Sequence, residues 1–271
     1  MPFWERRCTM SYVNSALRSE QSDRIRSNIK RLKLSHNLAD FCIETATAKT
    51  LDFIDVMFAD EATRRESNNL ALRLHNAGFP TMKNIDDYDF SELRMPASMT
   101  KEQMLSLDFI EQKNNLIMYG VCGSGKTMLS TCLGIMACNR KKTVKFITLS
   151  QLAVRLRTAA EEGRLENCIN SFRKLDLLII DEWGYCQLDK QSAGYVFQII
   201  SDSYESKSLI ITTNLPFSEW GRIVTDEQLA AAIIDRIVHY GHFIDCGKKD
   251  WRLASSPMNN QTFVEKKEPR Q

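Results

Sequence analysis

The chain has 271 residues, of which 43% are hydrophobic and 26% charged, and its formal net charge is +2. This composition is that of an ordinary globular protein with one large domain or two small ones. No apolar run reaches the roughly 20 residues that a membrane-spanning helix needs, and the start of the chain lacks the apolar core of a secretory signal. We therefore expect a cytoplasmic protein without a membrane partner.

Charge is unevenly distributed along the chain. Residues 1–36 hold eight Lys and Arg against three Asp and Glu, residues 37–110 hold seven against thirteen, and residues 247–271 hold six against three. Basic ends on a near-neutral body suggest a polyanion such as nucleic acid as partner. A solvated basic face is the alternative reading.

The eight cysteines contain no C-x-x-C pair, and they show no metal-ligand spacing with the four histidines. In a reducing cytoplasm such cysteines are expected to be free and mostly buried thiols. His239 and His242 lie three positions apart, but no third ligand is nearby. No metal site is expected there.

The first third of the chain is expected to be helical. One helix is expected over residues 22–46, capped by Ser22, because apolar residues recur at helical spacing: Ile25, Ile29, Leu32 and Leu38. A second, long helix is expected to run from about residue 51 to a stop at Gly78 and Pro80. Residues 1–85 are therefore predicted to form a small all-helical N-terminal domain that binds DNA or a partner.

The rhythm of the sequence changes after a turn-rich connector and a short amphipathic helix near residues 104–110. Short apolar runs then alternate with helical or turn sequence: residues 116–119, 143–149, 175–181, 208–214 and 242–246. This alternation predicts βα units and a mostly parallel five-stranded sheet, buried on both faces and flanked by helices. The second domain is expected over residues 86–254, followed by a flexible basic tail over 255–271.

A glycine-rich loop follows the first expected strand directly and opens a helix, which is the context that a phosphate-binding loop requires. Its backbone N–H groups and the helix N-terminus favour phosphate. We expect Lys126 to reach the β- and γ-phosphates of ATP and the Thr127 hydroxyl to ligate Mg²⁺. The residues expected to bind the nucleotide are Gly120, Val121, Cys122, Gly123, Ser124, Gly125, Lys126, Thr127 and Met128. The thiol of Cys122 has no catalytic task in such a loop.

An acidic pair follows the third expected strand. The apolar run 177–180 delivers Asp181 and Glu182 at its C-terminal end, where ligands of α/β proteins bind. Asp181 is expected to hold the Mg²⁺ shell through water, and Glu182 to act as the general base that orients the attacking water. An ordinary pair of surface carboxylates is the alternative.

Two further polar residues are candidates for the same chemistry. Asn214 ends the fourth expected strand, where its amide can hydrogen-bond the γ-phosphate and the lytic water; capping of the turn before Pro216 is the alternative. Arg236 is a candidate for an arginine supplied from a neighbouring subunit, against a local ion pair with Asp235 or Asp226. Arg252 is a second candidate for that arginine. The guanine-reading pattern N-K-x-D is absent from the sequence.

The chain resembles the IstB-like transposition helper ATPases, relatives of the DnaC-like helicase loaders, over roughly residues 25–254. The resemblance lies chiefly in the segments GVCGSGKT, KLDLLIIDEWGY, ISDSYESKSLIITTNLPFSEWGRIV and LAAAIIDRIVHYGHFID. It implies an AAA+ P-loop ATPase, with Asn214 matching the sensor and Arg236 matching the arginine-finger region. Too few residues follow Cys246 for a full C-terminal lid, so none is expected.

The resemblance also implies a function. Members assemble on double-stranded DNA as homo-oligomers in an ATP-dependent way, remodel it and present the target to a transposase encoded by the same mobile element. The alternatives are a helicase loader of the DnaC kind, whose partner is a replicative helicase, and a nucleotide-gated DNA-binding module that scarcely hydrolyses ATP. Glu182 and Asn214 argue against the last.

Two basic clusters are candidates for contact with DNA phosphates, with a solvated helical face as the alternative for each. The N-terminal cluster is Arg24, Arg26, Lys30, Arg31 and Lys33. The central cluster, between the second and third expected strands, is Arg155, Arg157, Arg164, Arg173 and Lys174. Contacts to the DNA backbone without base reading suit a protein that accepts many target sequences.

Overall fold

The computed structural model of the chain describes residues 18–254. The chain divides into two compact units at Leu72 and Arg73, earlier than the expected boundary between residues 85 and 86. The N-terminal unit and the ATPase-like unit are named here by that division, as residues up to 72 and from 73 onward. The expected flexible tail over residues 255–271 lies outside the described residues. The expectation of no full C-terminal lid depends in part on the same residues.

The division falls inside helix α3, Ala48–Ala77, because the last turns of that helix contact the second unit. The guanidinium Nε of Arg73 donates a hydrogen bond to the carbonyl of Cys138 at 3.1 Å. The ammonium of Lys145 donates to the carbonyl of Asn76 at 3.0 Å, and Ala77 is fully buried. These residues therefore belong to the ATPase-like unit.

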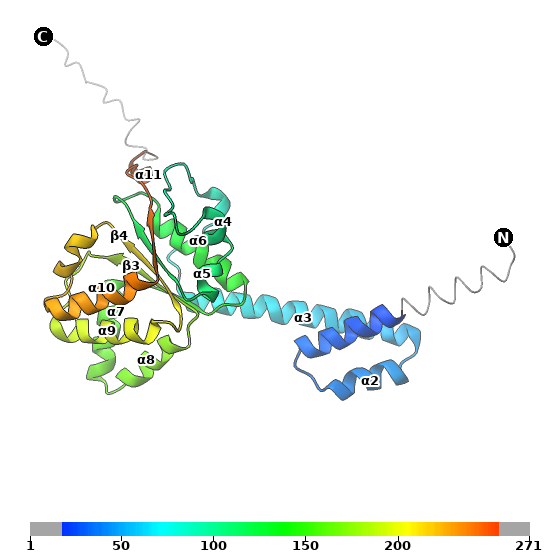
Figure 1. The fold of residues 1–271 in the computed structure, drawn as a ribbon. Coiled ribbons are helices and arrows are strands. Elements are labelled where there is room, and N and C mark those ends of the chain that lie inside the picture. Colours follow the sequence, from blue (N-terminus) through cyan, green and yellow to red (C-terminus); the bar gives the residue numbers. More distant parts are fainter. Residues whose placement is uncertain (1–17, 255–271) are drawn as a thin grey trace, which may run out of the picture. The chain divides into compact units, whose positions relative to one another are not determined.

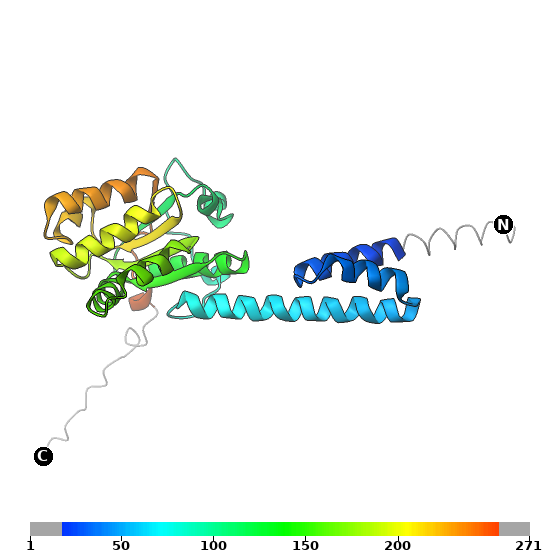
Figure 2. The ribbon, with the colours of Figure 1, turned by 90° about the horizontal axis from the view of Figure 1, so that it is seen from below.

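The N-terminal unit is all-helical, as expected. It consists of a helix over residues 18–31, α2 (His36–Thr45) and the first part of α3. Figures 1 and 2 show the two shorter helices lying along α3. Together they enclose a small apolar core: Ile25, Ile29, Leu32, Ala39, Cys42, Leu51, Phe58 and Ala62.

The prediction of one helix over residues 22–46 is wrong. The first helix ends at residue 31. Lys33 then has a left-handed φ of 56°, and α2 begins at His36. Ser22 lies within the first helix, where its hydroxyl donates to the carbonyl of Arg18 at 2.8 Å, so it is not an N-cap. The apolar residues keep a helix-like spacing across this break because both helices pack against the same core.

The ATPase-like unit contains the expected five-stranded sheet. Its strands are β1 (Asn115–Tyr119), β2 (Val144–Thr148), β3 (Leu177–Trp183), β4 (Ser208–Thr213) and β5 (Gly241–Asp245). All neighbours are parallel, and the order across the sheet is β2-β3-β4-β1-β5. The fold class expected from the sequence, an α/β sheet flanked by helices after a helical N-terminal region, is confirmed (Figure 1).

The helices of this unit fill the crossovers and the sheet margins. They are α4 (Lys101–Leu105), α5 (Asp108–Glu111), α6 (Lys126–Asn139), α7 (Leu149–Glu161), α8 (Leu165–Arg173), α9 (Lys190–Ser203), α10 (Glu227–His239) and α11 (Trp251–Ala254), with 3₁₀ turns η1 (Ile85–Asp87) and η2 (Phe217–Arg222). The short helix expected near residues 104–110 is split in two at Leu107, whose φ is 57°. No helix in the described part of the chain is both long and apolar enough to cross a membrane.

The sheet is covered on both faces, which explains why its strands are continuous apolar runs. Leu178 and Ile180 point to the face covered by α7, α9 and α10, within a large apolar cluster. Ile179 points to the other face, beneath α6. A Cβ on Gly134 of α6 would lie 2.8 Å from the Cδ1 of Ile179, so this glycine lets α6 approach the sheet closely. Helix α6 starts at the C-terminal edge of the sheet because it follows β1, and its Thr127 contacts Asp181 near the end of β3.

Candidate nucleotide-binding site

The loop between β1 and α6 curls through left-handed backbone. Gly123 and Gly125 have φ of 77° and 89°, a region that costs glycine nothing. Gly125 is also the N-cap of α6, and a Cβ there would lie 3.0 Å from the ring of Tyr88. The glycine therefore brings the N-terminus of α6 and its free N–H groups to the place where an anion is favoured.

Lys126 lies folded back against this loop. Its side chain is only 8% exposed, and its ammonium donates to the carbonyls of Gly120 at 2.9 Å and Val121 at 2.7 Å. Burial lowers the pKa of Lys126 because it penalises the charged form. A phosphate beside the ammonium would offset that penalty, so the loop suits an anionic ligand.

Thr127 and Asp181 meet at the head of the loop. The Thr127 hydroxyl donates to both carboxylate oxygens of Asp181 at 3.1 Å. Asp181 is 4% exposed and also accepts from the hydroxyl of Thr212. The described residues hold no group of three or more His, Cys, Asp or Glu side chains that would bind a metal alone. One hydroxyl and one carboxylate do fit Mg²⁺, which keeps waters and binds substrate phosphates.

Glu182 stands on a bulge in β3. The pairing with β4 shifts register between Ile180 and Trp183, and Glu182 has a left-handed φ of 60°. Its N–H donates to the Thr212 hydroxyl at 3.1 Å, while its side chain is exposed. A non-glycine residue in this conformation costs about 1–3 kcal/mol and such strain clusters at functional sites. The bulge turns the carboxylate out of the sheet, which the sequence did not predict.

A cavity of about 470 Å³ joins these elements. It is lined by the loop from Cys122 to Met128, by Glu182 and by Thr212 and Thr213 at the end of β4. Gly120 and Val121 do not line it; they lie behind the loop, where they accept from Lys126. The structure thus brings the two sequence motifs, the loop and the acidic strand end, to one cavity.

The cavity also contains residues that no sequence pattern indicated for it. Thr81 and Lys83 come from the segment after α3, Tyr185 from the turn after β3, and Trp251 and Arg252 from α11. The sequence predicts for Arg252 only a role toward the site of a neighbouring subunit, whereas it lines the cavity of its own chain. These residues are far apart in the chain, so only their packing reveals the association.

Asn214 follows β4 immediately. It does not line the cavity, although its neighbours Thr212 and Thr213 do. Its side-chain oxygen Oδ1 is buried and has no hydrogen-bond partner among the described residues. A buried acceptor without a partner is costly, and the expected contact of this amide with the γ-phosphate stays a prediction.

Arg236 lies in α10 and does not line the cavity of its own chain. Its guanidinium stacks 4.7 Å above the ring of Phe197 and donates to the carbonyl of Ala232 at 3.1 Å. Among the described residues Arg236 forms no ion pair with Asp235 or Asp226, the alternative that the sequence left open, and Asp226 pairs with Lys190 at 3.5 Å. The expected role toward a neighbouring subunit stays a prediction.

The cysteines of the described part are free, as expected, and Cys122 is exposed. Cys122 and Tyr185 both line the cavity, so the loop and the turn after β3 contribute to the same wall. Burial raises the pKa of Cys138 to about 11 and that of Cys246 to about 12. The reactive thiolate is therefore disfavoured at those two positions.

All three arginines of the N-terminal basic cluster are paired with acidic side chains. The ion pairs are Arg24 with Asp55 at 2.9 Å, Arg26 with Asp40 at 3.2 Å, and Arg31 with Glu66 at 2.6 Å. Lys30 and Lys33 are exposed and form no ion pair with another described residue. Exposed pairs contribute little to stability, yet they must open before their arginines can contact phosphate.

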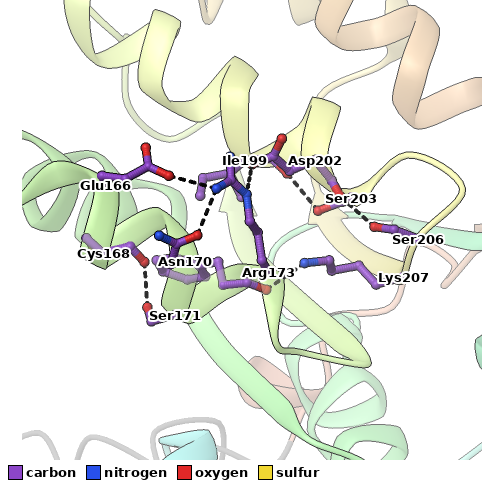
Figure 3. Close-up of polar contacts among 11 residues, drawn as sticks. Glu166, Cys168, Asn170, Ser171, Arg173, Ile199, Asp202, Ser203, Ser206 and Lys207 are labelled. Atoms are coloured by element: carbon purple, nitrogen blue, oxygen red, sulfur yellow. Dashed lines mark hydrogen bonds and ion pairs between the residues drawn. The ribbon is translucent and has the colours of Figure 1, made fainter.

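The central basic cluster likewise contains some cations that have partners and others that form no ion pair with a described residue. Arg173 donates to Glu166, Asn170 and Asp202, each at 2.8 Å (Figure 3). The bond to Asp202 ties α8 to α9, and the bonds to Asp202 and Glu166 raise the pKa of Arg173. In the same cluster Arg164 pairs with Glu162, and Arg155 stacks 4.9 Å above the ring of Phe172.

Two members of the central cluster, Arg157 and Lys174, are exposed and unpaired among the described residues. Nearby, Lys207 is buried and donates to the carbonyl of Phe172 at 2.6 Å (Figure 3). That lysine is a satisfied internal cation rather than part of a basic surface. Arg157 and Lys174 therefore need no ion pair broken before they contact a polyanion.

Comparison with known proteins adds a family context. The sequence model of the family described as IstB-like ATP binding protein matches residues 27–258. A Geobacillus stearothermophilus protein, named as an ATP-binding protein of insertion sequence IS5376, is 34% identical over 210 residues, 78% of this chain and 84% of the relative. A Bacillus thuringiensis subsp. berliner protein, named in the same way for IS232, is 34% identical over 236 residues, 84% of this chain and 93% of the relative.

The solved structures similar to this chain include a crystal structure of the DnaC helicase loader. It is 20% identical, with a TM-score of 0.47, and the match covers 64% of this chain and 98% of that chain.

Proposed function

This chain belongs to the family of IstB-like ATP binding proteins, and we propose that it is an ATPase that helps a transposase act on double-stranded DNA. The observation that carries the ATPase is the convergence of Lys126, Thr127 and Glu182 on one cavity, with Asp181 bonded to Thr127 beneath it. The transposase as partner is supported by relatives that are named for insertion sequences.

The loop and the strand ends have separate tasks in hydrolysis. The loop N–H groups, the N-terminus of α6 and Lys126 hold the phosphates. Thr127 and Asp181 would hold Mg²⁺, which neutralises phosphate charge when it is bound. Glu182 accepts a proton from a water whose oxygen attacks the γ-phosphorus, while the bond to the bridging β–γ oxygen breaks and ADP leaves.

Asn214 completes the hydrolytic site in this proposal. Its amide N–H₂ donates to the γ-phosphate, and its unpartnered Oδ1 accepts from the attacking water. An amide does this without adding charge next to Asp181 and Glu182. Binding of nucleotide would therefore give the buried acceptor the partner that it lacks.

Arg236 of a neighbouring subunit is proposed to stabilise the transferring phosphoryl group, in a homo-oligomer formed on DNA. Arg236→Ala protein should then bind ATP normally and hydrolyse it poorly. Mixing it with Lys126→Ala subunits, which keep the arginine, should restore part of the rate. Full turnover by Arg236→Ala protein alone would exclude this role.

DNA binding is proposed to use backbone contacts, from Lys30 and Lys33 in the N-terminal unit and from Arg157 and Lys174 in the ATPase-like unit. These cations are exposed and form no ion pairs with other described residues, so contact with phosphate breaks nothing. Each phosphate contact steepens the dependence of affinity on salt, by a slope of about 0.9 per contact for duplex DNA.

The deciding experiment combines DNA retention with partner capture. Purified protein should retain duplex DNA with ATP and lose it as salt rises, and Lys126→Ala protein should show no ATP dependence. Immobilised protein should capture the purified transposase encoded beside it. Capture of a replicative helicase without capture of the transposase would instead favour the helicase-loader alternative. Retention that is insensitive to salt would contradict the proposed backbone contacts.

A further inference from the structure

One buried hydroxyl in the nucleotide cavity has no partner. Thr131 in α6 is 1% exposed, and its Oγ1 has no hydrogen-bond partner among the described residues. A helical threonine usually donates to the carbonyl one turn earlier, here that of Thr127. The Ser130 hydroxyl already donates to that carbonyl at 3.0 Å. The Thr131 hydroxyl is thus shut off from solvent and left unsatisfied, which is destabilising.

The position of Thr131 assigns it to one end of the cavity. It lines the cavity together with Met128, and also with Thr81 and Lys83 from the segment after α3. Met128 and Thr131 lie three residues apart and so share a helix face. At 1.5 Å per residue, Thr131 lies about 6 Å along α6 from Thr127. It therefore lies beyond the end of the cavity that suits phosphates.

The part of a nucleotide that extends beyond its phosphates is the nucleoside. A flat base finds an apolar neighbour in Met128, and the lining residues Thr81 and Lys83 belong to exposed chain outside any helix or strand. A base edge that reaches the buried hydroxyl would displace part of this exposed segment. A hydroxyl can donate to a ring nitrogen or accept from an exocyclic amine.

We propose that the Thr131 hydroxyl hydrogen-bonds the base of the bound nucleotide and thereby sets the affinity for its nucleoside part. The inference rests on the proposed function, because it takes the nucleotide to be the ligand of this cavity. It assigns to Thr131 a binding task that is separate from the phosphate-holding loop.

The test replaces the hydroxyl by a methyl group of similar size in the full chain. Thr131→Val should raise the Tm of nucleotide-free protein, because an unsatisfied buried hydroxyl is removed. It should weaken ATP binding about fivefold, the value of one net hydrogen bond, and leave binding of inorganic tripolyphosphate unchanged. Thr131→Ser keeps the hydroxyl and should keep the affinity for ATP. Titration calorimetry with both probes and thermal unfolding supply the readouts.

A matched control lies one residue earlier in the same helix. The Ser130 hydroxyl has a partner, so Ser130→Ala should lower the Tm of nucleotide-free protein while Thr131→Val raises it. A Tm that falls in Thr131→Val would overturn the inference, because the hydroxyl would then already have a partner. So would unchanged ATP affinity, or an equal loss for tripolyphosphate.

The failure of the inference is distinguishable from failure of the proposed ATPase. Wild-type protein that binds neither ATP nor tripolyphosphate would overturn both. Wild-type protein that binds both probes, with Thr131→Val indistinguishable from it, would overturn the inference alone.

Discussion

The ATPase-like unit and the N-terminal unit differ in where their charged side chains lie. In the ATPase-like unit two of the groups assigned to chemistry are buried, Lys126 at 8% and Asp181 at 4% exposed, while Glu182 is exposed. In the N-terminal unit the charged residues lie on the surface, and large apolar side chains lie there too, such as Phe53 at 68% and Val56 at 69%. The ATPase-like unit also exposes apolar side chains, such as Val154 at 52%, but among the described residues it alone buries charged side chains.

The difference follows from how much each unit can enclose. A sheet covered on both faces can bury polar groups at its C-terminal edge, provided that each has partners, and burial strengthens their electrostatic interactions. Three helices enclose only a small core and leave other apolar side chains outside. We expect function in the ATPase-like unit to depend on single polar atoms, and function in the N-terminal unit to depend on its surface.

The largest effect is expected for Glu182. Glu182→Gln removes the base while it keeps the size of the side chain, so ATP hydrolysis should slow by about 10²–10⁴-fold with ATP affinity retained. Steady-state phosphate release and nucleotide titration measure the two quantities. Glu161→Gln changes an exposed side chain at the end of α7, outside the cavity lining, and should leave both quantities unchanged. A Glu182→Gln protein that hydrolyses ATP at the wild-type rate would contradict the assignment.

The next effect concerns the stability of the N-terminal unit. Ile29 is fully buried, and Ile29→Ala should lower the free energy of unfolding of this unit by about 2–5 kcal/mol. Phe53→Ala should change it by less than about 0.5 kcal/mol, because Phe53 is mostly exposed. Hydrogen exchange of amides between residues 18 and 72 in the full chain reports both values. Equal losses would show that the contrast in burial does not hold in solution.

A smaller effect is expected for Arg252, which lines the cavity of its own chain. Arg252→Ala should weaken ATP binding by about tenfold, since a hydrogen bond to a charged group is worth about 1.5–3 kcal/mol and this residue is exposed. Lys248→Ala, in the same segment but outside the cavity lining, is the matched control. Normal ATP affinity combined with lost hydrolysis would indicate instead that Arg252 acts on the nucleotide of a neighbouring subunit.

The smallest effect concerns thiol labelling. Iodoacetamide should modify Cys122 before Cys138 and Cys246, because Cys122 is exposed while burial raises the pKa of the other two. Labelling of Cys122 should slow about threefold when free ATP is twice its Kd, in proportion to the unbound fraction. Peptide mass spectrometry gives the rates, and Cys168 outside the cavity should be insensitive to ATP. Equal rates at Cys122 with and without ATP would show that nucleotide does not cover the loop.

Local sequence determined much of the fold and of the site. The sequence predicts the five strands because a parallel strand that is buried on both faces is a continuous apolar run, such as Leu177–Ile180. The sequence predicts Lys126 and Thr127 as phosphate-loop residues because such a loop needs glycines at fixed positions between a strand and a helix. Asp181 was readable as the acidic end of a buried strand. Each of these signals depends on residues within a few positions of one another.

Tertiary packing decided the rest. It broke the first helix at Lys33 and placed Glu182 on a bulge, because strand register and helix contacts overrule local spacing. It paired Arg173 with Asp202, and it brought Arg252 to the cavity of its own chain. It also left the Thr131 hydroxyl without a partner. The sequence by itself determined which residues are suited to bind a nucleotide, because that chemistry is local. Only the tertiary structure decided which distant side chains join them, because those contacts depend on how separate elements pack.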